Sequence, residues 1–204
     1  MESFELLASP IWVNLLVLVP LVLFWYWKKN KLSITRNSLL KTAVFGIAFG
    51  FIEAAVVVYL RAALGFLPGF EGTIADVWKE AKSFYYNQQL VAEELPLSLL
   101  TVEFFREAFT MLMLWSVAFI AATKLRERFA LFVWMFAFWD IFYYVFLYAT
   151  VRWPMSLSTP DLLFLIPVPW MSQVWFPVLV STLSIIAVFL NSRPRKQGPN
   201  RTIF

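Results

Sequence analysis

Five ionisable residues interrupt long apolar stretches of this sequence. They are Glu53, Glu103, Arg106, Glu107 and Asp140. On insertion scales such a residue costs about 2.5–3.5 kcal/mol at the middle of a membrane helix, so it normally faces other protein groups or water. Carboxylates grouped with a guanidinium could act as general acid and base, relay protons or bind a cation. We therefore treat these five residues as candidate catalytic residues.

Helical spacing groups several of these side chains. Glu103, Arg106 and Glu107 fall three and four residues apart, so they share one face of a helix. In a second stretch, Asp140 is followed four residues later by Tyr144, whose phenol can hydrogen-bond and stack. Tyr144 is therefore added to the candidate catalytic residues.

Charge balance makes this set a functional candidate. Four acids against one deep arginine leave an excess of negative charge, and like charges in a low dielectric cannot all be ionised cheaply. Some acids must be protonated, pair with Arg61 or Arg152, or bind a cation. Such a cation would be hard, for example Mg²⁺, Ca²⁺ or Na⁺, because the available ligands are oxygens. The competing interpretation is a structural polar network that sets the rotation of the helices.

The sequence contains no Cys and no His. Disulfides and thiolate ligands are thereby excluded, and the commonest metal ligand and general base are missing. These absences argue against haem, zinc and Ser-His-Asp chemistry, and they leave the cofactor unknown.

Composition places the candidate residues in a membrane protein. Hydrophobic residues make up 61% of the 204 residues and charged residues 15%, with a mean hydropathy of +0.71. Soluble domains have roughly 45–50% apolar residues and about 25% charged residues. Several apolar runs approach or exceed the roughly 20 helical residues that cross a bilayer. These runs are 10–27, 42–64, 97–123, 129–150 and 162–190.

Backbone groups in lipid must be hydrogen-bonded within the protein, so each run is expected to be helical. We predict an all-α polytopic membrane helix bundle with five transmembrane helices, forming one domain over 1–190 with a polar cytoplasmic tail over 191–204. Gly46 and Gly50 begin a stripe of small residues that permits close helix approach. Glu53 borders this stripe.

Two segments are expected to depart from simple spans. Residues 73–90, with Thr73 as N-cap, have the spacing of an amphipathic helix that lies on the outer interface or packs on the bundle. The last run exceeds the length that a bilayer needs and contains Pro167, Pro169 and Pro177. Proline removes an amide donor and clashes with the preceding turn, so residues 166–170 are expected to break the last helix near its outer end, with an irregular or re-entrant piece before the final span.

Basic residues are unequally distributed between the two sides of the predicted bundle. Twelve lie on one side, four on the other, and Arg106 lies within a span. The twelve are Lys28, Lys29, Lys31, Arg36, Lys41, Lys124, Arg126, Arg128, Arg193, Arg195, Lys196 and Arg201. The positive-inside rule then places the N-terminus outside and the C-terminus in the cytoplasm of a multi-pass protein of the cell inner (plasma) membrane. The net charge of +4 follows from this bias and does not argue for a nucleic-acid partner.

Several blocks of the sequence resemble those of a family of small polytopic bacterial membrane proteins that is itself uncharacterised. They are 51–54, 59–61, 106–108, 139–144 and 163–170. In addition, Glu93 and Glu94 before Pro96, followed by Glu103 and two phenylalanines, are similar to the acid and di-aromatic motif of heterodimeric-type lycopene cyclases. That resemblance implies a small multi-helix protein whose membrane carboxylates protonate a polyene.

These observations favour an integral membrane protein with a buried carboxylate and arginine site open to the outer leaflet. The site would handle a lipid-soluble molecule, a proton or a cation. In an enzyme, one protonated glutamate would act as general acid and an ionised neighbour as base. In a transporter, the same acids would form a relay. The alternative is a structural or assembly subunit of a membrane complex or homo-oligomer, whose intramembrane charges pair with partner helices.

The distribution of basic residues gives a testable orientation. Reporter fusions after Arg36, Arg126 and Lys196 are expected to be cytoplasmic, and a fusion after Lys82 is expected to be external, because Lys and Arg are retained on the cytoplasmic side. The location of each fusion point is measured with two reporter enzymes, one active only in the cytoplasm and the other active only outside it. An external reporter after Arg126 would contradict the five-span topology.

Overall fold

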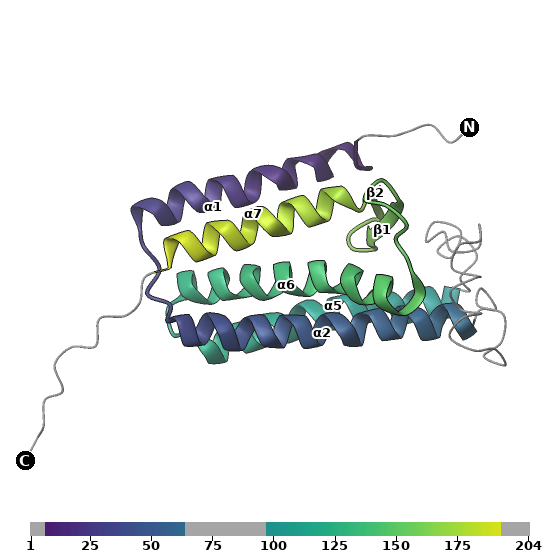
Figure 1. Cartoon of the computed structure of the whole chain (residues 1–204), viewed down its shortest axis with the longest axis horizontal. Coiled ribbons are helices and arrows are strands. Elements are labelled where there is room, and N and C mark those ends of the chain that lie inside the picture. Colours follow the sequence, from purple (N-terminus) through teal and green to yellow (C-terminus); the bar gives the residue numbers. More distant parts are fainter. Residues whose placement is uncertain (1–6, 64–96, 193–204) are drawn as a thin grey trace, which may run out of the picture.

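The structure is a computed structural model that describes residues 7–63 and 97–192. Helices make up most of this part of the chain (Figure 1). In order they are the 3-10 helix η1 (Ile11–Val17) and the α-helices α1 (Leu18–Lys29), α2 (Arg36–Ala63), α5 (Leu97–Ala121), α6 (Leu125–Val151) and α7 (Trp175–Asn191). Two short strands, β1 (Pro160–Phe164) and β2 (Trp170–Gln173), precede α7.

Helix α6 is the centre of the bundle. It packs against α2, α5 and α7, and α7 in turn packs against α1 (Figure 1). Leu131, Met135 and Leu147 on α6 are completely buried. A helix that is apolar on all sides is typical of such a central position.

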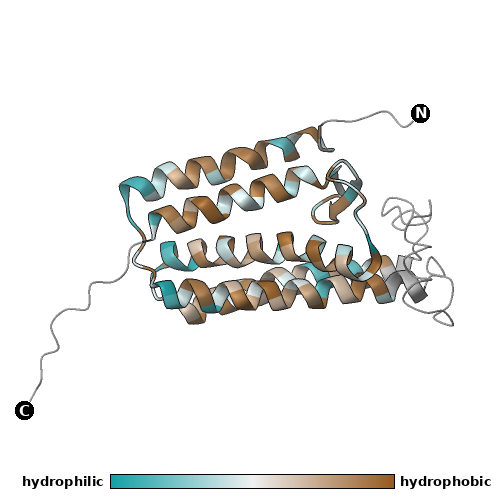
Figure 2. Ribbon diagram, viewed as in Figure 1, coloured by the Kyte–Doolittle hydropathy of each residue, from teal (hydrophilic) through white to brown (hydrophobic). Residues whose placement is uncertain are grey.

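Four of the described helical segments are long and apolar enough to cross a membrane. They are Ile11–Lys29, Arg36–Tyr59, Leu100–Ala121 and Leu125–Val151. Helix α7 is apolar but has 17 residues, a rise of about 26 Å against a hydrocarbon core of roughly 30 Å. Apolar residues cover most of the helix lengths (Figure 2). The described chain therefore has the composition and helix lengths of a polytopic membrane protein.

Glycine allows α2 and α6 to approach with their backbones in contact. A Cβ atom at Gly46 would lie 2.7 Å from the carbonyl oxygen of Met135, and one at Gly50 would lie 2.9 Å from that of Trp139. The two helices therefore meet along the stripe of small residues that the sequence contains. This contact turns Glu53, less than one turn beyond Gly50, into the bundle, where it is 4% exposed.

The all-α prediction was wrong for the segment before α7. Strands β1 and β2 form an antiparallel hairpin, with Asp161 opposite Ser172 and Leu162 opposite Met171. Pro167 and Pro169 lie in the connection between the strands, where no ladder hydrogen bond needs their missing amide donors. The chain is thus non-helical at 165–169, as these prolines led us to expect, but the residues on either side of this segment pair as strands.

The last helix begins only after this hairpin, so the break expected at 166–170 lies before it, and Pro177 does not interrupt it. Pro177 is the third residue of α7. Because the first four amides of a helix have no intrahelical acceptor, proline removes no hydrogen bond there.

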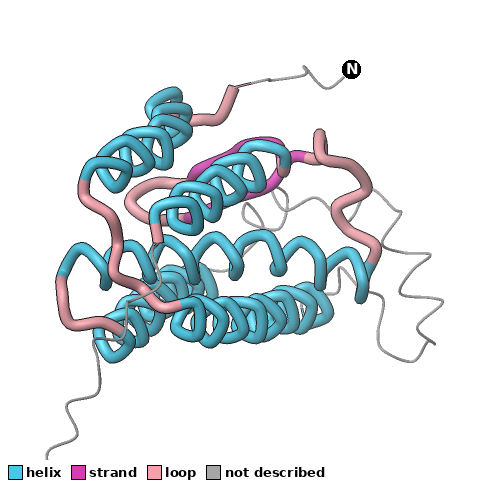
Figure 3. The backbone as a smooth tube through the Cα atoms, turned by 60° about the vertical axis from the view of Figure 1, so that its left-hand side comes forward, coloured by secondary structure: helices cyan, strands magenta, loops and turns pink. Residues whose placement is uncertain are grey.

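The segment before η1 anchors the hairpin to the N-terminal part of the chain. The amide of Ser9 donates to the carbonyl of Met171 at 2.8 Å, and the amide of Met171 donates back at 2.7 Å. Ala8, Val13 and Phe176 pack beside this pairing. The hairpin leads directly into α7 (Figure 3), and it lies at one end of the bundle (Figure 1).

Three expectations fall wholly or partly outside the described residues. The amphipathic helix expected at 73–90, with its N-cap Thr73, lies there entirely, as does the tail from 193 onward. The side chain of Arg61 also lies outside the described set. Asn191, expected to begin the tail, belongs to α7 and is buried.

The glycine contact gives a stability prediction. In an open helix position, alanine would stabilise by up to about 1 kcal/mol relative to glycine. In Gly46→Ala the added methyl group would collide with the α6 backbone, so we expect a loss of about 1–3 kcal/mol, as for other overpacked sites. Thermal unfolding of the detergent-solubilised protein measures this.

The matched control is Ala48→Leu, because Ala48 lies on the exposed side of the same helix. That variant should change stability little. A more stable Gly46→Ala protein would show that α2 and α6 are not in backbone contact.

Candidate functional site

A cavity of about 150 Å³ lies at the hairpin end of the bundle. Its lining comes from α2, α5, α6, α7 and the hairpin, with one residue from η1. All six candidate residues predicted from the sequence line it, namely Glu53, Glu103, Arg106, Glu107, Asp140 and Tyr144. The structure therefore brings together residues from α2 and from the consecutive helices α5 and α6, which follow α2 much later in the sequence.

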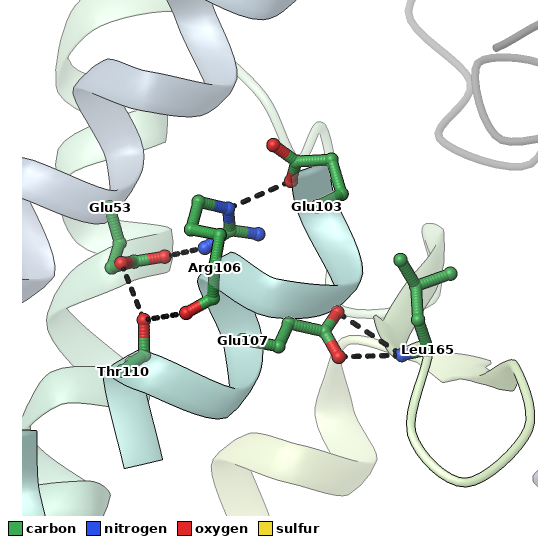
Figure 4. A network of polar contacts seen from close by, with 6 residues as sticks. All are labelled: Glu53, Glu103, Arg106, Glu107, Thr110 and Leu165. Atoms are coloured by element: carbon green, nitrogen blue, oxygen red, sulfur yellow. Dashed lines mark hydrogen bonds and ion pairs between the residues drawn. The ribbon is translucent and has the colours of Figure 1, made fainter. Parts of the chain in front are cut away.

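Arg106 is the centre of the polar network on one side of the cavity (Figure 4). Its Nη1 forms an ion pair with Glu53 of α2, and its Nε donates to Glu103, one turn earlier on α5, at 2.8 Å. The Thr110 hydroxyl lies 3.0 Å from the Glu53 carboxylate and 2.9 Å from the Arg106 carbonyl. The guanidinium thus joins two helices through their carboxylates, one of which is almost fully buried.

Glu107 points from α5 toward the hairpin. Both of its carboxylate oxygens accept from the backbone amide of Leu165, at 2.9 and 3.1 Å (Figure 4). Leu165 follows the last residue of β1. A carboxylate on a membrane helix therefore satisfies the first amide beyond the strand and holds the hairpin over the cavity.

Helix α6 makes two further polar contacts at the cavity. Ser181 of α7 donates its hydroxyl to Asp140 at 2.7 Å. The Tyr144 hydroxyl donates to Asp161 of β1 at 2.6 Å, and both of these residues are buried. The acids of α6 and β1 thus accept hydrogen bonds from neighbouring elements.

The cavity carries an excess of acidic groups. Five carboxylates line it, because Asp161 joins the four that the sequence indicated, and Arg106 is the sole Lys or Arg in the lining that the structure describes. Glu53 and Glu103 share this guanidinium. Across the described ranges, no ion pair is formed by Glu107 or Asp140, and no group of three or more acids is suited to hold a metal ion.

Aromatic side chains from α6 and the hairpin also line the cavity. Phe164 of β1 stacks on Phe136 of α6, with ring centroids 6.1 Å apart. Trp139 and Trp170 lie 6.2 and 5.5 Å from Phe164. A predominantly apolar pocket with a few placed polar groups is the usual form of a small-molecule site.

Asp161, Ser181 and the Leu165 amide were not among the candidate site residues. Ser181 occurs in an apolar run, where a buried polar residue does indicate a polar neighbour, although spacing does not say which one. The Leu165 amide carries no side-chain information. It reaches Glu107 only because the chain forms a hairpin there.

No family model, curated protein or solved structure matches this chain. The resemblance to heterodimeric-type lycopene cyclases therefore remains an expectation from the sequence. Two of its acids, Glu93 and Glu94, lie outside the residues that the structure describes.

The Arg106 network gives a second stability prediction. Arg106→Met would leave the buried Glu53 without its cation. Removing one member of a fully buried pair costs about 3–5 kcal/mol. We expect a loss at or below that range, since the Arg106 side chain is 24% exposed.

The double variant with Glu53→Gln should recover much of this loss, because the buried charge of Glu53 is then removed as well and only Glu103 keeps a carboxylate without its cation. Arg36→Met, at an exposed arginine that begins α2, serves as the control and should be nearly neutral. Equal losses in the single and double variants would reject the ion pair as the source of the effect.

Proposed function

We propose that this chain is a multi-pass membrane protein that binds a small lipid-soluble molecule in the cavity and exchanges a proton with it. The observation that supports this proposal is one cavity with aromatic walls and acidic groups among helices of membrane length. A dry cavity of about 150 Å³ in another protein accommodates a benzene ring. The cavity thus has room for a ring or a short chain.

The proposal includes five membrane crossings, with α7 as the fifth, and a cavity near the outer leaflet. Basic residues gather at one end of the bundle, where α1 ends at Lys29 and α2 begins at Arg36 (Figure 1). The hairpin and the cavity lie at the opposite end. Retention of basic residues in the cytoplasm would then direct the cavity outward in the inner membrane.

Glu107 and Asp140 are the groups best placed to exchange a proton. Protonating Glu53 would break its ion pair with Arg106. In contrast, the donors to Glu107 and Asp140 are a backbone amide and a serine hydroxyl, both neutral. We therefore assign Glu53, Glu103 and Arg106 to positioning, and Glu107 and Asp140 to general acid and base chemistry.

Two alternatives have less support from the geometry. A subunit whose intramembrane charges pair with partner helices would present those charges outward, whereas Glu53 and Glu107 are buried within the chain. A site for a bare metal cation needs several converging acids, and the described residues contain no such group. A lipid-soluble ligand uses both the aromatic and the acidic sides of the cavity.

The proton-exchange proposal is tested in a strain that lacks the gene. Its lipid-soluble compounds, profiled by mass spectrometry, should differ from those of the parent strain, and the wild-type gene should restore the parent profile. Asp140→Asn and Glu107→Gln keep side-chain size but remove a titratable group, so neither should restore it at equal protein abundance.

Glu127→Gln is the matched control. Glu127 is also a buried acid of α6, but it lies near the other end of the helix, where it accepts a hydrogen bond from the Ser33 amide. This variant should restore the profile. Full restoration by both Asp140→Asn and Glu107→Gln would reject acid and base chemistry in the cavity.

A further inference from the structure

Two indole N–H groups at the cavity have no acceptor within residues 7–63 and 97–192. Trp139 of α6 and Trp170 of β2 both line it. Their Nε1 atoms are buried, and neither has a hydrogen-bond partner among the described residues. Trp139 as a whole is only 9% exposed. Buried tryptophan normally finds an acceptor, and an unsatisfied buried donor costs about 1–3 kcal/mol. These two groups therefore point to a ligand atom that accepts hydrogen bonds.

The same cavity also offers acceptors. An ionised carboxylate has about four acceptor positions. Asp140 lines the cavity and receives one hydrogen bond, from Ser181, among the side-chain contacts described. A ligand group that donates a hydrogen bond would use the remaining capacity.

The cavity thus offers indole donors and a carboxylate acceptor, and the chemical groups of a ligand differ in which of the two they can use. An ammonium group only donates, so it would leave the indole donors unsatisfied. A carbonyl or ether oxygen only accepts, so it would not use an ionised Asp140. A hydroxyl group does both, because it has one donor and two acceptor lone pairs.

We propose that the ligand is a lipid-soluble alcohol. Its hydroxyl oxygen accepts a hydrogen bond from the indole N–H of Trp139 or Trp170, and its hydroxyl group donates a hydrogen bond to Asp140. Its apolar body lies against Phe136 and Phe164. This assignment rests on the proposed function, since it names the class of molecule that the cavity takes. A neutral head also avoids the cost of transferring a charged group from water into the bundle.

Four probes that share one ring separate the possibilities. Benzyl alcohol carries the hydroxyl, toluene replaces it with a methyl group, benzaldehyde only accepts, and benzylamine at neutral pH only donates. Affinities are measured by ligand-observed NMR on the full-length protein in detergent micelles. Val180→Phe serves as the control for binding elsewhere, because Val180 lines the cavity and a larger side chain would fill it. Binding that this variant abolishes is assigned to the cavity.

Each probe is then compared between the wild type, Trp139→Phe, Trp170→Phe and Asp140→Leu. Benzyl alcohol should bind about tenfold more weakly to Asp140→Leu and to at least one of the two tryptophan variants, which corresponds to about 1.4 kcal/mol. Toluene should bind each variant at least as well as the wild type. Benzaldehyde should bind more weakly only to the tryptophan variant that weakens benzyl alcohol, and benzylamine only to Asp140→Leu. If Asp140→Leu does not fold, Trp139→Phe and Trp170→Phe test the donor half alone.

The remaining outcomes separate this inference from the function on which it rests. Toluene binding to the cavity, with benzyl alcohol unaffected by every variant that folds, would overturn the alcohol assignment and leave the proposed function standing. If Asp140→Leu reduces the affinity for benzylamine more than the affinity for benzyl alcohol, the ligand has a cationic head group and the alcohol assignment is overturned. Failure of all four probes to distinguish the wild type from Val180→Phe would overturn both.

Discussion

Inside an apolar bundle, a charged group that has no partner within the protein is costly, and this constraint positions the site. Helix α5 shows it most clearly, because only 17% of its membrane-length window is buried. Apolar packing alone therefore constrains its rotation weakly. Arg106 pairs with Glu53 of α2, and Glu107 accepts from the Leu165 amide. These contacts orient the polar face of α5 toward the cavity, while its phenylalanines at 104, 105 and 109 are exposed, as expected for lipid contact.

The hairpin is what makes a cavity possible at this end of the bundle. A continuous helix would pack its side chains against α6, whereas the hairpin lies across the bundle end, held at separate points. Ser9 pairs with Met171, Asp161 accepts from Tyr144, and Leu165 donates to Glu107. Because the bonds of Ser9 with Met171 and of Leu165 with Glu107 satisfy backbone groups of β2 and of the connection, non-helical chain is tolerated beside the membrane-length helices. The roof is therefore specified by polar contacts, and the space beneath it has both aromatic and acidic walls.

Several parts of the site follow from sequence pattern and several do not. The helical spacing of Glu103, Arg106 and Glu107 predicts their shared face, and the cost of burying charge predicts that they turn inward. The local sequence pattern does not predict that Arg106 pairs with Glu53, because these residues are 53 positions apart. Asp161 and the Trp139 indole gain their place at the cavity only from the hairpin and from the α2–α6 contact.

By itself, the sequence determined a mostly helical membrane protein, the apolar runs that supply its long helices and a set of intramembrane acids around one arginine. These conclusions rest on local quantities, namely hydropathy, residue spacing and the cost of a charge in lipid. Only the tertiary structure decided that a hairpin precedes α7, that Glu107 binds its backbone and that all six candidate residues line one cavity. Strand pairing and helix crossing depend on contacts between distant segments, such as Ser9 with Met171, and hydropathy carries no record of which distant segments meet.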